Sequence, residues 1–391
     1  MEKQIYFDHA ATTFVKPEVV DAMLPYFTQE YGNASTVYKL GESSKSALDN
    51  ARQTVADIIG CLPREIYFTS CGTEADNWAL KGVAFANKAK GNHIITSQIE
   101  HHAVLHTCKY LEKNGFEVTY LPVDEYGKIN IDDLKNAIKD TTILISIMFA
   151  NNEIGTVQPI KEIGAVARER GIYFHTDAVQ AVGAMPINVA DMNIDMLSMS
   201  AHKFNGPKGV GALYIKGGTR IDNLFHGGGQ ELKKRAGTEN IAGIVGLATA
   251  LKLANDTLDE KINSLTQKRD YIINTIQNTI PFAKLNGHPT DRLPSNINFS
   301  FKFIEGESLL LWLDIAGIAA SSGSACTSGS LDPSHVLLAI GLPHEIAHGS
   351  LRISLGEENT MEEINYFLEK LPEIVLKLRK MSPLYEGVEG E

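Results

Sequence analysis

The sequence predicts an α/β fold in which a mostly parallel central sheet is flanked by helices and joined by a smaller α+β unit. Between about residues 50 and 250, strand-like and helix-like segments alternate, which is the pattern of βαβ units. Beyond residue 257, a long amphipathic segment and a few separate strands replace this alternation. With 391 residues, 43% of them hydrophobic, the chain is long enough for two domains and a sizeable core.

The large unit contains apolar segments that are typical of strands and amphipathic segments that are typical of helices. Strands are expected at 65–70, 93–97, 117–123, 142–150, 172–178 and 196–201, and helices at 73–89 and 160–171. In a parallel sheet, ligands bind outside the carboxyl ends of the strands. Polar residues that directly follow these strands are therefore the candidates for a site.

The smaller unit begins near a long amphipathic helix expected at 258–280, whose apolar positions are Leu258, Ile262, Leu265, Ile272 and Ile276. We expect a large domain at 16–256, and a small α+β domain formed by 1–15 together with 257–391. Its strands are expected at 296–303 and 351–356.

The last helix of the small domain has a recognisable start. Thr360 and Glu363 have the spacing of a capping box, in which each side chain bonds a backbone N–H of the other residue.

Charge and composition argue against several classes of partner. The net charge of −11 makes a nucleic acid an unfavourable partner. No run of eighteen apolar residues predicts a membrane-spanning helix. The first residues, "MEKQIYFDHAATT", lack the basic and apolar regions of a secretory signal, so we expect a cytoplasmic protein.

The four cysteines are Cys61, Cys71, Cys108 and Cys326, and none forms a CxxC pair. Neither zinc ligation nor a disulfide framework is therefore expected. Cys61 and Cys108 are interpreted as ordinary buried thiols. Cys326 differs, because its surroundings, "SGSACTSGS", contain only small residues and offer no apolar packing. This setting indicates a role other than packing.

Two polar residues follow predicted buried strands. Lys203, in "SAHKFNGPKG", is either a surface lysine or a desolvated amine that forms a Schiff base with an aldehyde. Asp177, in "HTDAVQAVG", is either a helix N-cap or the carboxylate that faces the pyridine nitrogen of pyridoxal phosphate. Gln180 can reach the same region.

Two further strand ends carry weaker signals. Gly72 and Thr73 lead from a strand into a helix, and a helix N-terminus with these residues can bind phosphate. His101, in "SQIEHHAVL", could stack on a cofactor ring and move protons. Metal binding is the other possibility for His101, but no third ligand has suitable spacing.

Longer motifs carry a family resemblance. They are "NNEIGTVQPI", "HTDAVQAVG", "SAHKFNGPKGVGALY", "HGGGQE" with "RAGTEN", and "SSGSACTSG". In this order they resemble the cysteine desulfurases of the NifS/IscS type, within the class V aminotransferase group of fold type I pyridoxal phosphate enzymes. The resemblance runs from "YFDHAATT" to "LRISLG", and "SSGSACTSGS" followed by "LDPSHVLLAIGL" is the long-loop pattern of group I.

The resemblance implies roles for individual residues. Lys203 would hold the cofactor as a Schiff base, His101 would stack on its ring and transfer protons, and Asp177 would face its ring nitrogen. The other expected cofactor contacts are Gly72, Thr73, Asn152, Gln180, Ser200, His202 and Thr238. Thr238 would reach the phosphate of the neighbouring subunit, which implies a homodimer.

Two residues would act on the substrate. Arg352, between the apolar residues Leu351 and Ile353, would bind the substrate carboxylate, with Asn152 nearby. Cys326 would be the nucleophile that accepts sulfur, on a loop of about residues 321–332. Such a small-residue segment behaves as a flexible linker, and about ten residues span roughly 15–20 Å.

The implied activity is removal of sulfur from L-cysteine, which gives L-alanine and a persulfide on Cys326. The persulfide would be delivered to an acceptor such as an iron–sulfur scaffold protein, and Cys326 could transiently ligate the cluster there. No metal is expected in the isolated enzyme. The alternatives are a selenocysteine lyase or a class V aminotransferase on the same fold, and, outside catalysis, a binding module that kept the fold.

Overall fold

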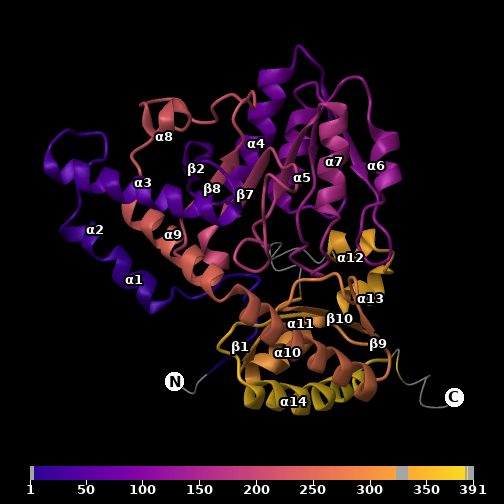
Figure 1. Cartoon of the computed structure of the whole chain (residues 1–391). Helices are drawn as coiled ribbons and strands as arrows, with labels where there is room; N and C mark the ends of the chain where they lie inside the picture. Colours follow the sequence, from indigo (N-terminus) through magenta and orange to yellow (C-terminus); the bar gives the residue numbers. More distant parts are fainter. Residues whose placement is uncertain (1–3, 323–332, 384, 386–391) are drawn as a thin grey trace.

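The protein is described by a computed structural model that covers residues 4–322, 333–383 and 385 (Figure 1). Its main sheet has seven strands in the order β2-β8-β7-β6-β5-β3-β4. Their bounds are β2 Ile66–Thr69, β3 His93–Ser97, β4 Glu117–Leu121, β5 Thr142–Ser146, β6 Tyr173–Asp177, β7 Met196–Ser200 and β8 Gly211–Ile215. Each of the six strands predicted for the large unit is present.

The main sheet is mostly parallel, as predicted. The pairs from β7 through β6, β5 and β3 to β4 are all parallel, and only β8 runs antiparallel to its neighbours β7 and β2. Strand β8 was not predicted. The strand predicted at 142–150 ends at Ser146, and beyond it the Met148 N–H bonds the Glu100 carboxylate.

Two hydrophobic cores cover the two faces of this sheet, and successive residues of one strand belong to them in alternation. In β7, Met196 belongs to one core and Leu197 to the other, and in β8 Leu213 and Tyr214 are divided in the same way. This is the two-residue period of a strand that is buried on both faces.

Helices supply the outer side of each core. One face packs against α3 (Lys39–Ile59), α7 (Ile160–Arg170) and α9 (Ile241–Asp256), and the other against α4 (Gly72–Asn87) and α5 (His102–Glu112). Shorter helices are α1 (Pro17–Met23), α2 (Pro25–Thr28), α6 (Ile131–Ala137) and α8 (Gln230–Lys233). Among the described residues, no single helix is long and apolar enough to cross a bilayer, and α9 passes this test only together with α10 (Leu258–Thr279), as a pair bent by 71°.

A second unit lies below the main sheet in Figure 1. Its antiparallel sheet has the order β12-β10-β9, from β9 (Ala283–Leu285), β10 (Asn296–Phe301) and β12 (Ser350–Ser354). Its core includes residues of α10 (Leu258–Thr279), α11 (Gly306–Ile315) and α14 (Met361–Lys380). The predicted capping box is present at the start of α14.

The N-terminus contributes to this second unit. Strand β1 (Ile5–Tyr6) pairs with β11 (Ile318–Ala319), and the Phe7 side chain is part of the second core. Helices α12 (His335–Ala339) and α13 (His344–His348) lie between the two units in Figure 1. Separate cores support the division at residues 16 and 257, which we keep as a proposal.

Candidate active site

Four predicted site residues follow strands of the main sheet. Asp177 is the last residue of β6, and Lys203 ends the short 3₁₀ turn Ala201–Lys203 after β7. Gly72 opens α4 soon after β2, and His101 is the N-cap of α5 after β3. Strands β3, β5, β6 and β7 run parallel, so His101, Asp177 and Lys203 lie at the same edge of the sheet, and His101 and Lys203 both act electrostatically on Asp177.

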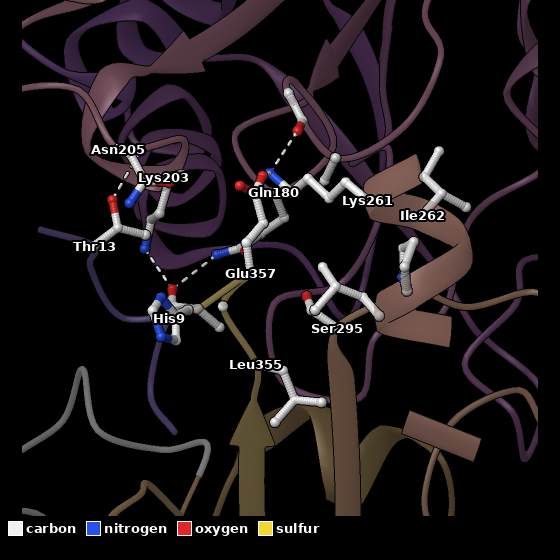
Figure 2. Close-up of a pocket in the computed structure, with 16 residues that line it drawn as sticks. His9, Thr13, Gln180, Lys203, Asn205, Lys261, Ile262, Ser295, Leu355 and Glu357 are labelled. Carbon is white, nitrogen blue, oxygen red and sulfur yellow. Dashed lines mark hydrogen bonds and ion pairs between the residues drawn. The ribbon is translucent and has the colours of Figure 1, made fainter. Parts of the chain in front are cut away.

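The Lys203 amine is held by the N-terminal segment. Its Nζ donates to the carbonyl oxygens of Ala10, at 2.6 Å, and Ala11, at 2.8 Å. Figure 2 shows that Gln180 points to the same oxygen of Ala10, to which its Nε2 donates at 3.0 Å. Lys203 and Gln180, both predicted site residues, therefore bond the same backbone oxygen of Ala10, which lies at least 170 residues earlier in the chain.

Thr13 fixes this N-terminal segment against the lysine turn. Its hydroxyl donates to the His202 carbonyl at 2.9 Å and accepts from the Asn205 N–H at 2.9 Å. The Lys208 amine donates to the Thr13 carbonyl at 3.0 Å. Sequence reasoning gave residues 8–13 no role in the site, although their run of small residues could have signalled a close backbone approach.

Asp177 is buried, and only 6% of the residue is exposed to solvent. Burial raises its pKa, while His101, a hydrogen bond from the Val179 N–H at 3.0 Å, and Lys203 lower it. Turns and not a helix follow Asp177, so the helix N-cap alternative is wrong. The carboxyl is therefore positioned by a turn, close to two groups that carry or accept protons.

The His101 ring is oriented by its own helix. Its Nδ1 accepts a hydrogen bond from the Ala103 N–H at 3.1 Å, which fixes the ring at the N-terminus of α5. The preceding residue, Glu100, is buried, and its Oε1 accepts from the Ser97 hydroxyl at 2.6 Å and the Met148 N–H at 2.9 Å. Burial raises the pKa of Glu100 to about 8. Sequence reasoning missed this carboxyl.

The start of α4 has the form expected of a phosphate site. A Cβ added to Gly72 would lie 2.7 Å from Val179 Cγ2 and 3.5 Å from Ser200 Cβ, so glycine is required there. Thr73 beside it is exposed. Burial, Lys203 and Lys208 lower the pKa of His202 to about 4, so its ring is neutral at pH 7.

These residues fit the cofactor that the sequence implied. Gly72 has no side chain, so a phosphate can approach the start of α4. The buried carboxyl of Asp177 suits a protonated ring nitrogen, and Lys203 supplies an amine. Ser200 is buried at the end of β7, next to the Gly72 position.

Arg352 approaches from the second unit, in the middle of β12. It is 3% exposed, its Nη2 pairs with Asp8 Oδ1 at 2.7 Å, and its Nη1 donates to the Asn152 carbonyl at 3.1 Å. The Arg352 Nε–H is buried and has no hydrogen-bond partner within the described part of the chain. Asn152 meets Arg352 through its backbone, whereas a side-chain role was predicted.

Glu153 connects Arg352 with the sheet edge, and sequence reasoning missed it. The residue is buried, its carboxylate accepts from the Ser334 hydroxyl, and both Arg352 and His101 act on it electrostatically. Burial raises the pKa of Glu153 to about 7, against the opposing effects of Ser334, Arg352 and His101.

Cys326, with residues 323–332 of the loop predicted at about 321–332, lies outside the described residues. The residues on either side are described: Ser321 pairs with Arg352 through backbone hydrogen bonds of 2.6 and 3.2 Å, and Ser334 bonds Glu153. Both flanks of the predicted nucleophile's segment therefore start beside the arginine.

The remaining predictions have mixed outcomes. Cys108 is buried as predicted, and Cys61 is only half-buried, with a pKa that burial raises to about 12. Thr238 is exposed on the segment after α8.

A pocket is lined by Lys203, Gln180, His9, Lys261 and Glu357 (Figure 2). Its lining excludes His101, Asp177 and Arg352. We therefore assign the chemistry to the region between Arg352 and the sheet edge that carries His101 and Asp177, which Lys203 and Gln180 border from the side of this pocket.

Comparison with known proteins agrees with this geometry. The family model for class-V aminotransferases matches residues 5–367. The chain belongs to the class-V aminotransferase family. A cysteine desulfurase IscS of Clostridium botulinum (strain Hall) is 61% identical over 99% of this chain and 98% of the relative. The protein of the same name from Methanosarcina thermophila is 62% identical over 98% and 94%.

Solved structures extend the comparison. A NifS-like protein superposes with a TM-score of 0.90 at 40% identity, over 96% of this chain and 100% of that one. A structure described as SspA in complex with cysteine has a TM-score of 0.81 at 40% identity, over 90% and 98%. The predicted fold and the predicted resemblance to NifS/IscS-type cysteine desulfurases are confirmed.

Proposed function

We propose that this protein is a cysteine desulfurase that uses pyridoxal phosphate to remove sulfur from L-cysteine. The observation that carries the proposal is the convergence of Lys203, Asp177 and His101 at one edge of the sheet, opposite the buried Arg352. When bound, pyridoxal phosphate supplies an electron sink for the bonds around the substrate's α-carbon.

The sheet-edge residues would bind and orient the cofactor. Gly72, Thr73, Ser200 and His202 would surround the phosphate, and Gln180 and Asn152 would lie near the ring. Asp177 would keep a proton on the ring nitrogen. Lys203 would hold the cofactor covalently, and His101 would stack on its ring and move protons at the substrate.

Arg352 would bind the substrate carboxylate. Its Nε–H has no hydrogen-bond partner among the described residues, and Nη2 already pairs with Asp8. A carboxylate that bonds the Nε edge would add a charge-assisted hydrogen bond of about 1.5–3 kcal/mol. Asp8 and the Asn152 carbonyl would then hold the guanidinium plane in place.

Cys326 would accept the sulfur. The substrate's C–S bond breaks, an S–S bond forms on Cys326, and the remaining carbon skeleton takes up protons and leaves as L-alanine. His101 is the candidate for moving the proton, since it lies near both Asp177 and Glu153. The persulfide would pass to an acceptor protein such as an iron–sulfur scaffold.

A homodimer with shared sites is part of the proposal. Residues 14–38, around α1 and α2, expose large apolar side chains that a partner subunit would cover: Phe14, Val20, Leu24, Phe27, Tyr31, Val37 and Tyr38. Exposed apolar side chains that gather in one segment favour protein association. Thr238 would then reach the partner's phosphate. The unpaired thiols of Cys61, Cys71 and Cys108 support a reducing, cytoplasmic setting.

The test compares Cys326→Ser with Cys71→Ser, a half-buried thiol at the start of α4. Alanine and protein-bound persulfide are measured after cysteine is added. Cys326→Ser should bind the cofactor and cysteine but form neither product at a normal rate, whereas Cys71→Ser should form both. Normal alanine release by Cys326→Ser would contradict the proposal.

The same assay separates the alternatives on this fold. An aminotransferase would give a keto acid and would not need Cys326. A selenocysteine lyase would release selenium from selenocysteine but leave cysteine unreacted.

A further inference from the structure

A buried polar cluster lies behind Asp177, and the proposed function does not use it. His175 of β6 is held between two hydroxyls, with Nδ1 2.9 Å from Ser146 Oγ and Nε2 3.0 Å from Ser198 Oγ. Asp76 of α4 places its Oδ1 3.6 Å from His175 Nε2. Asp76 is 1% exposed, and this oxygen has no hydrogen-bond partner within the described part of the chain.

The surroundings of Asp76 oppose a negative charge. Burial raises its pKa most, followed by Asp177 at the end of β6, while a hydrogen bond from Ser198 on β7 lowers it. Glu100 after β3 and Cys71 before α4 raise it further.

His175 does not compensate with a positive charge. It is fully buried between strands, and burial lowers its pKa to about 3, so the ring is neutral at working pH. The contact between Asp76 and His175 is therefore not an ion pair, despite its charged residue types.

Asp177 differs from Asp76 in its partners. His101, Lys203 and the Val179 N–H all favour its carboxylate form. Asp177 raises the pKa of Asp76, and two buried carboxyls that interact in this way cannot both ionise cheaply, so one of them keeps a proton. The partners assign that proton to Asp76 and the charge to Asp177.

We propose that Asp76 is a positioning residue that stays protonated at working pH, so that Asp177 alone presents a negative charge to the cofactor's ring nitrogen. The inference rests on the proposed function for the role of Asp177. The protonation of Asp76 itself depends only on the contacts described above.

The first test is infrared spectroscopy of the full-length holoenzyme at about pH 8, where an ordinary aspartate is ionised. Labelling the aspartate side-chain carboxyls with ¹³C identifies any carbonyl band of a protonated aspartate and separates it from Glu100. Wild-type protein should show one such band. Its absence would overturn the inference without any variant being needed.

Two variants then assign the band. Asp76→Asn should remove it, and Asp177→Asn should leave it in place. If Asp177→Asn removes the band and Asp76→Asn does not, the proton belongs to Asp177 and the inference is wrong. Glu100→Gln is the matched control, because it alters a nearby buried carboxyl that is not an aspartate.

The second test reads the effect on the cofactor. Raising the pH should ionise Asp76 and add an alkaline inflection to the cofactor's absorbance in wild-type protein, and Asp76→Asn should lack this inflection. An identical alkaline inflection in both proteins would overturn the positioning role. If the protein binds no pyridoxal phosphate, the proposed function fails, while the infrared result still decides the protonation of Asp76.

Discussion

The two sides of the candidate site are built differently. The sheet side, formed by Asp177, Ser200 and Lys203, rests on strand ends that neighbouring strands hold in register. The opposite side, which we call the arginine side, is formed by Asp8, Glu153 and Arg352. Its residues come from a turn, the N-terminal segment and β12, and side-chain contacts hold them together.

The difference lies in how each side handles charge. On the arginine side, Arg352 and Asp8 form a buried ion pair, with side chains 4% and 18% exposed. On the sheet side, burial keeps His202 and His175 neutral and raises the pKa of Asp177. The Asp177 carboxylate is instead favoured by His101, the Val179 N–H and Lys203, which suits a site that must hold a cofactor's proton.

The sheet side should therefore give the largest effect on chemistry. Lys203→Ala should remove covalent cofactor attachment and lower the rate of alanine formation by at least about 10³-fold. Mass spectrometry after borohydride reduction measures the attachment. The matched control is Lys208→Ala, because Lys208 also donates to the N-terminal segment, at Thr13. Retained attachment in Lys203→Ala would place the anchor on another lysine.

The arginine side should affect substrate binding more than the chemical step. Arg352→Lys keeps a positive charge but loses the planar guanidinium, so KM for cysteine should rise about 10- to 100-fold. The cofactor spectrum should change little, because Arg352 reaches Asn152, an expected cofactor contact, only through its backbone carbonyl. Steady-state kinetics and an absorbance scan measure the two effects. A fall in kcat with constant KM would contradict the division between the two sides.

Glu153, on the arginine side, should make the stability of the folded protein depend on pH. The pKa of Glu153 is about 7 in the folded protein and about 4.3 in an unfolded chain. The folded state thus holds the proton more tightly, and its stability relative to the unfolded state falls as pH rises from about 4 towards 7. Glu153→Gln cannot ionise, so its stability should gain about 2–3 kcal/mol relative to wild type as the pH rises from 5 to 8.

Thermal unfolding at a series of pH values measures this gain. Glu100→Gln is the comparison from the sheet edge, since burial raises the pKa of Glu100 to about 8. Its gain should continue to rise about one pH unit beyond that of Glu153→Gln. A constant difference between wild type and Glu153→Gln from pH 5 to 8 would mean that Glu153 is ionised throughout.

The sheet side was largely predictable from sequence, and the arginine side was not. Asp177 and Lys203 were predictable because each directly follows an apolar strand, and parallel strands place such residues at one edge. The family resemblance indicated Arg352, but no local pattern indicated its pairing with Asp8, which is 344 residues away. Glu153 and Asp76 were missed because burial, which sets their pKa values, depends on packing.

The smallest predicted effect concerns the segment that links the two sides. Asp8 belongs to the arginine side, and Ala10 and Thr13, a few residues later, bond the lysine turn of the sheet side. Thr13→Val keeps the shape of the side chain but removes the hydroxyl, leaving the His202 carbonyl and Asn205 N–H without this partner. The loss should lower the free energy of unfolding by about 1 kcal/mol.

Thr13→Ser retains the hydroxyl and is the matched control. Denaturant unfolding measures the stability of both variants, and KM for cysteine reports whether the arginine side moved with the segment. We expect a larger KM in Thr13→Val than in Thr13→Ser, because a shifted segment would carry Asp8 away from Arg352. Equal KM values together with a lower stability would show that the two sides are positioned independently, since the segment would then support the lysine turn alone.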